Sequence, residues 1–202
     1  MTGRFIVLEG GEGCGKSTQV GLLADELGAL ATRQPGGTEL GSRLRALLLA
    51  AADDPVPLDE RAEALLMAAD RAQHVAEVIE PTLATGRHVV CDRYTPSTIA
   101  YQGHGRGLDV DWLRRLAAWA ARDLQPDLVV LLDVPADVAA ERRGAVSDRI
   151  EAAGGAFHRR VTESYLQQAA SDPGTWVVLD GSGTADEVAA AVRAAVADRL
   201  GI

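Results

Sequence analysis

The 202-residue sequence contains one lysine, Lys16, and no asparagine, while its other 19 basic residues are all arginine. It has only two cysteines, Cys14 and Cys91, which are too few for a disulfide framework and are typical of a reducing compartment. It also lacks an apolar run long enough to span a membrane. Because the composition favours arginine so strongly, the position of the single lysine needs a specific explanation.

The chain also has fewer basic residues than acidic ones. The formal net charge is −9, and nucleic-acid-binding surfaces are normally basic. The chain does not open with a basic, then apolar leader, so we expect a cytoplasmic protein with no membrane or nucleic-acid partner. Its length and its 47% apolar content fit one domain, residues 1–202, around a single core.

Short apolar runs alternate with longer helical patterns. The clearest runs, at 5–8, 129–132 and 177–179, are continuously apolar and rich in β-branched residues, as in strands buried on both faces, whereas the run at 29–33 is weak. Predicted strands are 4–9, 29–33, 88–92, 128–134 and 176–180, and predicted helices are 16–27, 39–51, 58–85, 110–123, 136–143, 149–170 and 185–200. This order predicts an α/β three-layer sandwich, a five-stranded parallel sheet with helices on both faces.

Helix ends are marked by polar residues and glycines. Asp59, Asp111 and Thr184 are predicted N-caps. The 58–85 pattern is longer than an ordinary helix, so we expect a kink or break near Asp70.

A glycine-rich loop directly follows the first predicted strand and precedes a helix. Residues 10–17 read Gly-Gly-Glu-Gly-Cys-Gly-Lys-Ser, which is the phosphate-binding pattern G-x-x-x-x-G-K-[ST] in its required setting. Glycines let backbone N–H groups approach phosphate oxygens, and the helix N-terminus favours the same anion. Lys16 is predicted to neutralise the β- and γ-phosphates, and Ser17 to bind Mg²⁺.

The missing residues narrow the class of phosphate-loop protein. Regulatory GTPases read guanine with an Asn-Lys-x-Asp motif, which a chain without asparagine cannot contain. A small phosphoryl-transfer enzyme remains, with the acceptor bound opposite ATP at the carboxyl edge of the sheet. Asp92 and Arg93 end the third strand, where Asp92 could hold Mg²⁺ and Arg93 could bridge the two phosphates. Arg33, in the loop with Pro-Gly-Gly that follows the second predicted strand, is expected to place a cation at the same edge.

Five ordered motifs make the chain resemble bacterial thymidylate kinases, which are P-loop nucleoside monophosphate kinases. They are the phosphate loop at 10–17, Arg-x-Pro-Gly-Gly-Thr at 33–38, Asp-Arg-Ala-Gln-His at 70–74, the segment 92–102 and Asp-Arg-Ile-Glu at 148–151. The resemblance covers essentially the whole chain. It implies the P-loop kinase fold, ATP with Mg²⁺ as the phosphoryl donor, dTMP as the acceptor, and a homodimer built from apolar faces within 58–85 and 110–123.

The resemblance also implies roles for individual residues. Catalytic residues would be Lys16, Asp92, Arg93 and Arg149, with Ser17 and Asp92 at the metal. ATP would contact Gly10, Gly11, Glu12, Gly13, Cys14, Gly15, Lys16, Ser17, Thr18, Arg142 and Arg143. The acceptor nucleotide would contact Glu12, Arg33, Met67, Arg71, Arg93, Ser97, Thr98, Tyr101 and Gln102.

The resemblance places a lid over ATP at about 141–151, with Arg142, Arg143 and Arg149 as its candidate cations. Several residues depart from the family pattern, among them Cys14, which stands where a smaller residue is common. Met67 replaces a phenylalanine that would stack on the base, and Gln34 replaces a glutamate. A kinase for another nucleoside monophosphate or a small metabolite, and a nucleotide-binding regulatory module without turnover, remain alternative functions. No histidine is assigned a catalytic role, and His74 is expected on a helix surface.

Overall fold

Five parallel strands form the centre of the fold. The computed structural model describes residues 2–51, 54, 57–142 and 148–202. The strands are β1 (Phe5–Gly10), β2 (Leu30–Arg33), β3 (Val89–Asp92), β4 (Leu128–Asp133) and β5 (Trp176–Asp180), in the spatial order β2-β3-β1-β4-β5. The prediction of five parallel strands is confirmed, including the weakly patterned second one.

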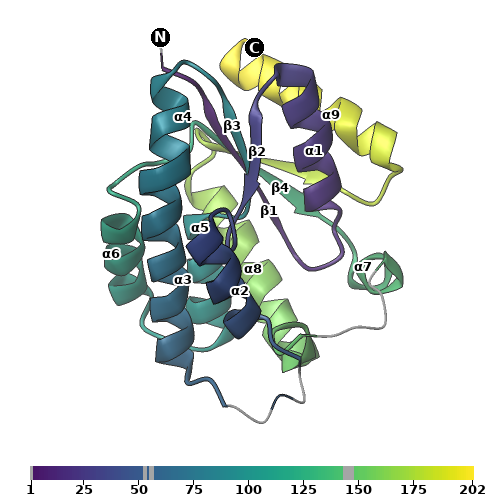
Figure 1. Ribbon diagram of the computed structural model, residues 1–202. Helices are drawn as coiled ribbons and strands as arrows, with labels where there is room; N and C mark the ends of the chain where they lie inside the picture. Colours follow the sequence, from purple (N-terminus) through teal and green to yellow (C-terminus); the bar gives the residue numbers. More distant parts are fainter. Residues whose placement is uncertain (1, 52–53, 55–56, 143–147) are drawn as a thin grey trace.

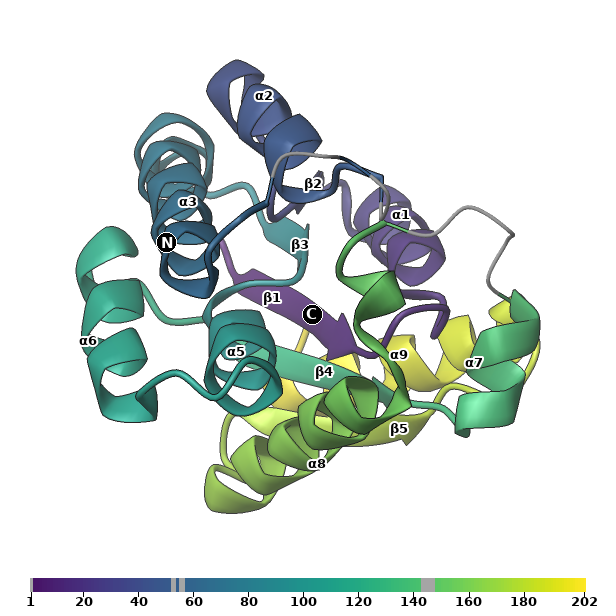
Figure 2. The ribbon, with the colours of Figure 1, turned by 90° about the horizontal axis from the view of Figure 1, so that it is seen from below.

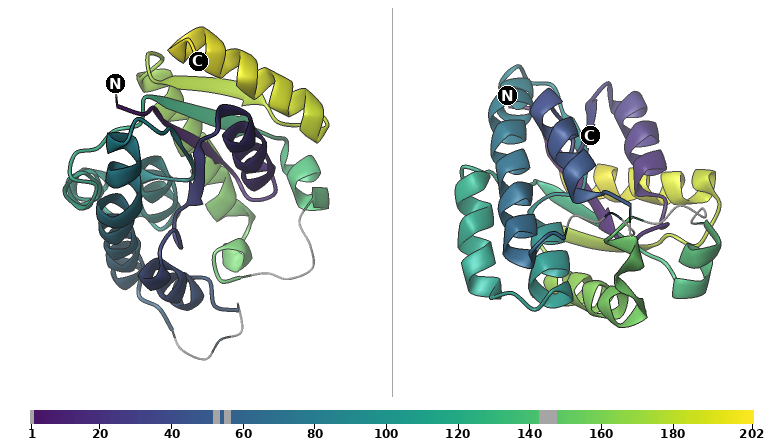
Figure 3. Two further views of the ribbon diagram at one scale, coloured as in Figure 1. Left: turned by 45° about the horizontal axis from the view of Figure 1, so that its top comes forward. Right: turned by 60° about the horizontal axis from the view of Figure 1, so that its bottom comes forward.

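Two helical layers cover the sheet. Helices α1 (Lys16–Leu27) and α9 (Ala185–Leu200) lie on one face, where they pack against alternate residues of β1 such as Ile6 and Leu8 (Figure 1). The other face, including Phe5 and Val7, packs against α8 (Gly155–Ser171) and the long helical segment before β3. Figure 3 shows α8 and α9 on opposite sides of the sheet. The predicted three-layer sandwich is therefore confirmed.

The long helical segment before β3 widens after its fourth turn. It consists of α3 (Glu60–His74), a π-helical stretch η1 (Val75–Ile79) and α4 (Glu80–Ala84). The expected break near Asp70 is wrong, because α3 continues regularly through that residue. Pro81 has no N–H group for the carbonyl of Glu77, four residues earlier, and this explains why the widening lies just before it.

The N-terminal ends of two other helices differ from the sequence prediction. Helix α6 (Val110–Ala120) is capped by Asp109, whose carboxylate accepts from the N–H of Trp112 at 2.7 Å. The predicted cap Asp111 is wrong, because its side chain pairs with Arg114 inside the helix. Thr184 does cap α9, with a complete capping box. The helix predicted from 149 starts only at Gly155, after a 3₁₀ turn η3 (Glu151–Ala153).

The remaining helices surround the edge at which the strands end (Figure 2). They are α2 (Glu39–Leu48), α5 (Thr95–Thr98), the π-helical η2 (Ile99–Gly105) and α7 (Ala136–Arg142). The sequence analysis did not anticipate the helical segment 95–105, which directly follows Arg93 and forms one side of the site. Among the described residues, no helix has the length and apolar character needed to cross a membrane.

Candidate functional site

The loop between β1 and α1 has the backbone geometry of a phosphate cradle. Gly10, Gly13 and Gly15 all have positive φ values, of 146°, 79° and 90°. At Gly10 a Cβ atom would also lie 2.6 Å from the carbonyl oxygen of Leu132 on β4. A residue with a side chain would therefore be strained at this position, which explains the glycine.

Lys16 begins α1 with its side chain folded back along this loop. Its Nζ donates to the carbonyl oxygens of Gly11 at 2.7 Å and Gly10 at 3.1 Å, and lies 3.3 Å from Sγ of Cys14. The side chain is buried. The ammonium group therefore lies within the loop that would surround the phosphates, and the sole lysine is where that charge is needed.

A cavity of about 450 Å³ opens beside this loop. Its lining combines residues predicted for ATP, for the metal and for the acceptor. They are Glu12, Gly13, Gly15, Lys16, Ser17, Thr18, Arg33, Gln34, Arg45, Asp92, Arg93 and Arg142. Four of these side chains are arginines, so the cavity has a strongly cationic wall in a chain whose net charge is −9.

Ser17 and Asp92 meet at one end of this cavity. The hydroxyl group of Ser17 donates to Oδ2 of Asp92 at 2.6 Å, joining the start of α1 to the end of β3. A hydroxyl and a carboxylate oxygen are ligands that Mg²⁺ accepts, and Mg²⁺ usually takes only one or two protein ligands beside phosphates and waters. No cluster of three His, Cys, Asp or Glu ligands occurs in the part of the chain that the structure describes. The pair therefore fits a nucleotide-bound Mg²⁺ and not an all-protein metal cage.

Arg93 has an unusual backbone conformation. Its φ is 70°, in the left-handed region that non-glycine residues rarely occupy. Nη1 of its guanidinium donates to the carbonyl of Gly10 at 2.9 Å and to the hydroxyl of Tyr165 at 3.0 Å. Such strain persists only where surrounding contacts hold it, and these hydrogen bonds to the phosphate loop and to α8 hold Arg93 in place.

Glu12 is the ion-pair partner of Arg93. Its Oε1 accepts from Nη2 of Arg93 and, at 2.9 Å, from the hydroxyl of Tyr101. Burial by itself would raise the pKa of Glu12, but Arg93, Lys16 and the hydrogen bond from Tyr101 outweigh it and lower that pKa to about 2. Glu12 is therefore ionised at neutral pH, and the Arg93 guanidinium also lies 4.9 Å from the centre of the Tyr101 ring.

A second, smaller cavity of about 150 Å³ adjoins the first. It contains most of the residues predicted for the acceptor nucleotide, and it shares Glu12, Gln34, Arg45 and Arg93 with the first cavity. Its other lining residues are Pro35, Leu49, Met67, Asp70, Arg71, Tyr94, Ser97, Thr98, Tyr101, Gln102, Asp148, Ile150 and Glu151. Of the predicted acceptor residues, only Arg33 lies solely in the larger cavity.

Thr98 and Gln102 are fixed by hydrogen bonds on the walls of the smaller cavity. Oγ1 of Thr98 accepts from Nη2 of Arg71 at 2.9 Å, so Thr98 is not a helix-surface residue. The amide nitrogen of Gln102 donates to Glu63 at 2.8 Å, and Glu63 also pairs with Arg106. Both side chains are buried, and these hydrogen bonds hold them in place.

The predicted lid arginines are not gathered at the phosphate loop. Arg142 lines the cavity of about 450 Å³ beside the phosphate loop, but its guanidinium donates to the carbonyl oxygens of residues 181–183. Arg149 lies 3.9 Å from Asp54 and lines a different cavity, with Glu63 and Arg106. Arg143 lies outside the described residues, as do residues 144–147 of the predicted lid at 141–151.

Three site residues escaped the sequence analysis. Arg45 lines both cavities, and its Nη1 donates to the carbonyl of Pro35 at 2.9 Å. Tyr165 lies on the buried face of α8, and the signal available was the apolar series Phe157, Val161, Tyr165 and Ala169, in which each residue follows the previous one by four. His74, expected on a helix surface, is fully buried, because the loop after β2 packs over that turn of α3.

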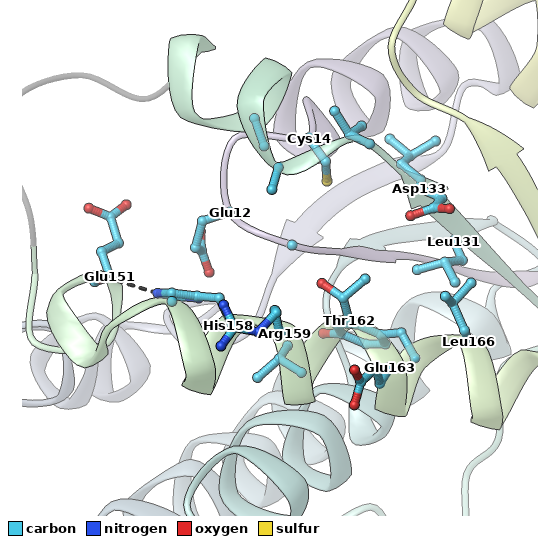
Figure 4. Close-up of a pocket in the computed structure, with 18 of the residues that line it drawn as sticks. Glu12, Cys14, Leu131, Asp133, Glu151, His158, Arg159, Thr162, Glu163 and Leu166 are labelled. Atoms are coloured by element: carbon cyan, nitrogen blue, oxygen red, sulfur yellow. Dashed lines mark hydrogen bonds between the residues drawn. The ribbon is translucent and has the colours of Figure 1, made fainter.

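A third cavity, of about 580 Å³, lies between the phosphate loop and α8 (Figure 4). Glu12, Glu151, His158, Arg159 and other polar side chains line one side, and an apolar wall comes from the end of β4. Glu12 and Glu151 also line the small cavity of about 150 Å³, so the two cavities are neighbours. In Figure 4 the His158 ring lies on the side of the cavity toward Glu12, and its Nε2 is 3.0 Å from the carbonyl of Glu151.

Comparison with known proteins identifies the family. The thymidylate kinase family model matches residues 8–192. The thymidylate kinase of Chromohalobacter salexigens is 50% identical over 98% of this chain and 97% of its own length. That of Cutibacterium acnes is 47% identical over 99% of both chains. The crystal structure of thymidylate kinase from Ehrlichia chaffeensis matches with a TM-score of 0.78 and 30% identity, covering 97% of this chain and 100% of that one. The protein therefore belongs to the thymidylate kinase family.

Proposed function

We propose that this protein transfers the γ-phosphoryl group of Mg·ATP to the 5′-phosphate of dTMP, giving dTDP and ADP. Family membership supports the reaction. The observation that carries the proposal is that Arg93 lines both the cavity beside the phosphate loop and the smaller cavity next to it. A cation at that junction can contact the two phosphates between which the phosphoryl group moves.

In this proposal the loop at Gly10–Ser17 holds the donor phosphates. Backbone N–H groups and the N-terminus of α1 bind their oxygens, and Lys16 turns from the carbonyls of Gly10 and Gly11 toward the β- and γ-phosphates. Ser17 and Asp92 would hold Mg²⁺, which neutralises phosphate charge when bound. The chain then has little covalent chemistry to perform beyond holding two anions in line.

The smaller cavity would take the acceptor nucleotide. Arg93 and Arg33 would contact its phosphate, and Arg45 is placed to assist them. Arg71, Thr98 and Gln102 would face the base with their hydrogen-bonding groups, and Met67 would cover its ring. Tyr101, fixed by Glu12, would crowd the 2′ position of the sugar, and Glu12 would face its 3′-hydroxyl group. The acceptor phosphate is already ionised, so the reaction needs no strong general base.

The lid at about 141–151 would supply a further cation. Arg142 already borders the larger cavity, whereas Arg149 would have to leave its position near Asp54. An arginine closing on the phosphates would stabilise transition-state charge and exclude water. We keep Arg142, Arg143 and Arg149 as the candidates for this role.

We also propose a cytoplasmic homodimer with no nucleic-acid or membrane partner. Both cysteines are buried and unpaired, which supports a reducing compartment. Leu65 on α3, and Trp112 and Trp119 on α6, are 52%, 42% and 78% exposed on helices that pack side by side. Exposed apolar groups of this size are typical of interaction surfaces. Light scattering at micromolar concentration should give twice the 21.2 kDa chain mass, and a monomer would contradict the dimer.

A coupled ADP-release assay with dTMP, dUMP, dGMP, AMP and shikimate tests the substrate. We expect dTMP to give the highest kcat/KM. A preference for another acceptor would indicate a different small-molecule kinase. ATP binding without transfer to any acceptor would favour a regulatory module.

A further inference from the structure

Three buried hydrogen bonds hold Arg71, through two of the three nitrogens of its guanidinium. Its Nε donates to Oε1 of Gln34 at 3.0 Å, and its Nη2 donates to Thr98 and to the carbonyl of Tyr94. The other terminal nitrogen, Nη1, is buried and has no hydrogen-bond partner among the described residues, although Arg71 lines the acceptor cavity. A buried donor without a partner is costly, so this nitrogen is available for an oxygen atom of a ligand.

The hydrogen bond to Arg71 determines how Gln34 is oriented. A guanidinium only donates, so the amide oxygen of Gln34 must face Arg71. The amide nitrogen of Gln34 then faces Nδ1 of His74, at 3.0 Å. Because that amide nitrogen also only donates, Nδ1 must be the unprotonated ring nitrogen.

The tautomer of His74 follows from this orientation. In a neutral ring with Nδ1 unprotonated, Nε2 carries the hydrogen, and it lies 2.7 Å from Oγ1 of Thr32. Burial and the nearby Arg71 charge lower the pKa of His74 to about 4, in agreement with a neutral ring at pH 7. Gly37 leaves room for the ring, since a Cβ atom there would lie 2.3 Å from Nε2.

We propose that Gln34 and His74 are positioning residues, which orient Arg71 so that Nη1 faces an accepting oxygen of the nucleotide in the smaller cavity. The relay runs from Thr32 through His74 and Gln34 to Arg71, and every member is neutral except the last. Among the described residues, no salt bridge involves Arg71, although the Asp70 and Glu9 carboxylates act on it electrostatically, and Gln34 holds the guanidinium without adding a charge. Because a guanidinium only donates hydrogen bonds, Nη1 favours an oxygen acceptor over an amino group. This inference rests on the proposed function, because it assigns the cavity to the acceptor nucleotide.

Two substitutions of His74 separate positioning from packing. His74→Leu removes the acceptor for Gln34, and we expect KM for dTMP to rise about tenfold while KM for ATP stays unchanged. His74→Asn can offer its Oδ1 at the place of Nδ1, and we expect KM for dTMP within about threefold of the parent value. Equal effects of the two substitutions on KM for dTMP would overturn the relay.

His88→Leu is the matched control. His88 accepts a hydrogen bond from the N–H of Arg4 at 2.8 Å, at the opposite edge of the sheet. We expect this variant to lower thermal stability without changing KM for dTMP. A rise comparable with that of His74→Leu would show that the KM effect reports general destabilisation, and would overturn the proposal.

Nitrogen NMR of the unsubstituted protein without nucleotide gives a readout that needs neither folding of a variant nor activity. We expect the ¹⁵N shifts of His74 to show a protonated Nε2 and an unprotonated Nδ1. In Gln34→Glu a carboxylate faces Nδ1, so the hydrogen should move to that nitrogen. A protonated Nδ1 in the parent protein would overturn the relay. If the parent tautomer is as expected and no acceptor is phosphorylated, the proposed function fails instead.

Discussion

The hydroxyl group of Ser17 lies 2.6 Å from a carboxylate oxygen of Asp92, although 75 residues separate the two in the chain. Parallel strands β1 and β3 are neighbours, and their ends bring the start of α1 beside the end of β3. The pair places a hydroxyl and a carboxylate oxygen beside the phosphate loop, where we propose that a nucleotide-bound cation lies.

Replacing Ser17 by alanine removes one of these two proposed metal-binding oxygen atoms. We expect Ser17→Ala to raise the Mg²⁺ concentration for half-maximal activity by about 10–100-fold, because losing a group that holds or orients a metal has effects of this size. Steady-state kinetics at a series of Mg²⁺ concentrations measure it. Ser171→Ala, which removes an exposed hydroxyl from the end of α8, should leave the Mg²⁺ dependence unchanged. An unaltered dependence in Ser17→Ala would remove this residue from the metal site.

Lys16→Ala tests the phosphate loop. We expect kcat to fall by at least about 10²-fold, since an ammonium group placed on the transferring phosphates stabilises charge that develops in the transition state. The melting temperature should change little, because the side chain bonds only to carbonyls of its own loop and to the Cys14 sulfur. Retained turnover in a folded variant would refute the assignment.

The Glu12 carboxylate should make stability depend on acidic pH. Its pKa is about 2 in the folded protein and 4.5 in its ordinary state, so its contribution is fully present above about pH 4.5 and is lost as the pH falls toward 2. The contribution is at most about 3 kcal/mol, since the side chain is 26% exposed. Urea unfolding at several pH values should show a shallower acid dependence for Glu12→Gln than for the parent. Identical slopes would contradict the ion pair with Arg93.

Tyr165→Phe tests the hydrogen bonds that the Tyr165 hydroxyl makes with Arg93 and its neighbours. The hydroxyl of Tyr165 contacts Arg93, Ser97 and the buried carboxylate of Glu9, at 3.0, 2.7 and 2.8 Å. Burial raises the pKa of Glu9, and removing a donor from that carboxylate should destabilise the fold by about 1–3 kcal/mol.

Tyr94→Phe is the matched control for this change. Its hydroxyl donates only to the carbonyl of Leu124, at 3.2 Å, so we expect a loss of about 1 kcal/mol or less in urea unfolding. A smaller cost for Tyr165→Phe than for Tyr94→Phe would contradict a structural role for the hydroxyl cluster.

The sequence by itself determined the order of elements and the phosphate loop, because both are local. Short apolar runs predicted the parallel strands, and the spacing of the glycines, Lys16 and Ser17 specified the phosphate loop. The motifs that follow β2 and β3 predicted that Arg33, Asp92 and Arg93 lie at one edge, because parallel strands end together. Family membership was also readable from the order of the five motifs.

Tertiary structure decided the contacts that act across elements. Nothing near His74 in the sequence indicates that the loop after β2 buries it, and nothing near Tyr165 indicates that its hydroxyl reaches Glu9 on β1. Arg149 is a further case, since its motif predicts a place near ATP, but no sequence pattern indicates its ion pair with Asp54. Local pattern gives a residue its element and its face, but hydrogen-bond partners depend on how those faces pack, and packing is set by the whole chain.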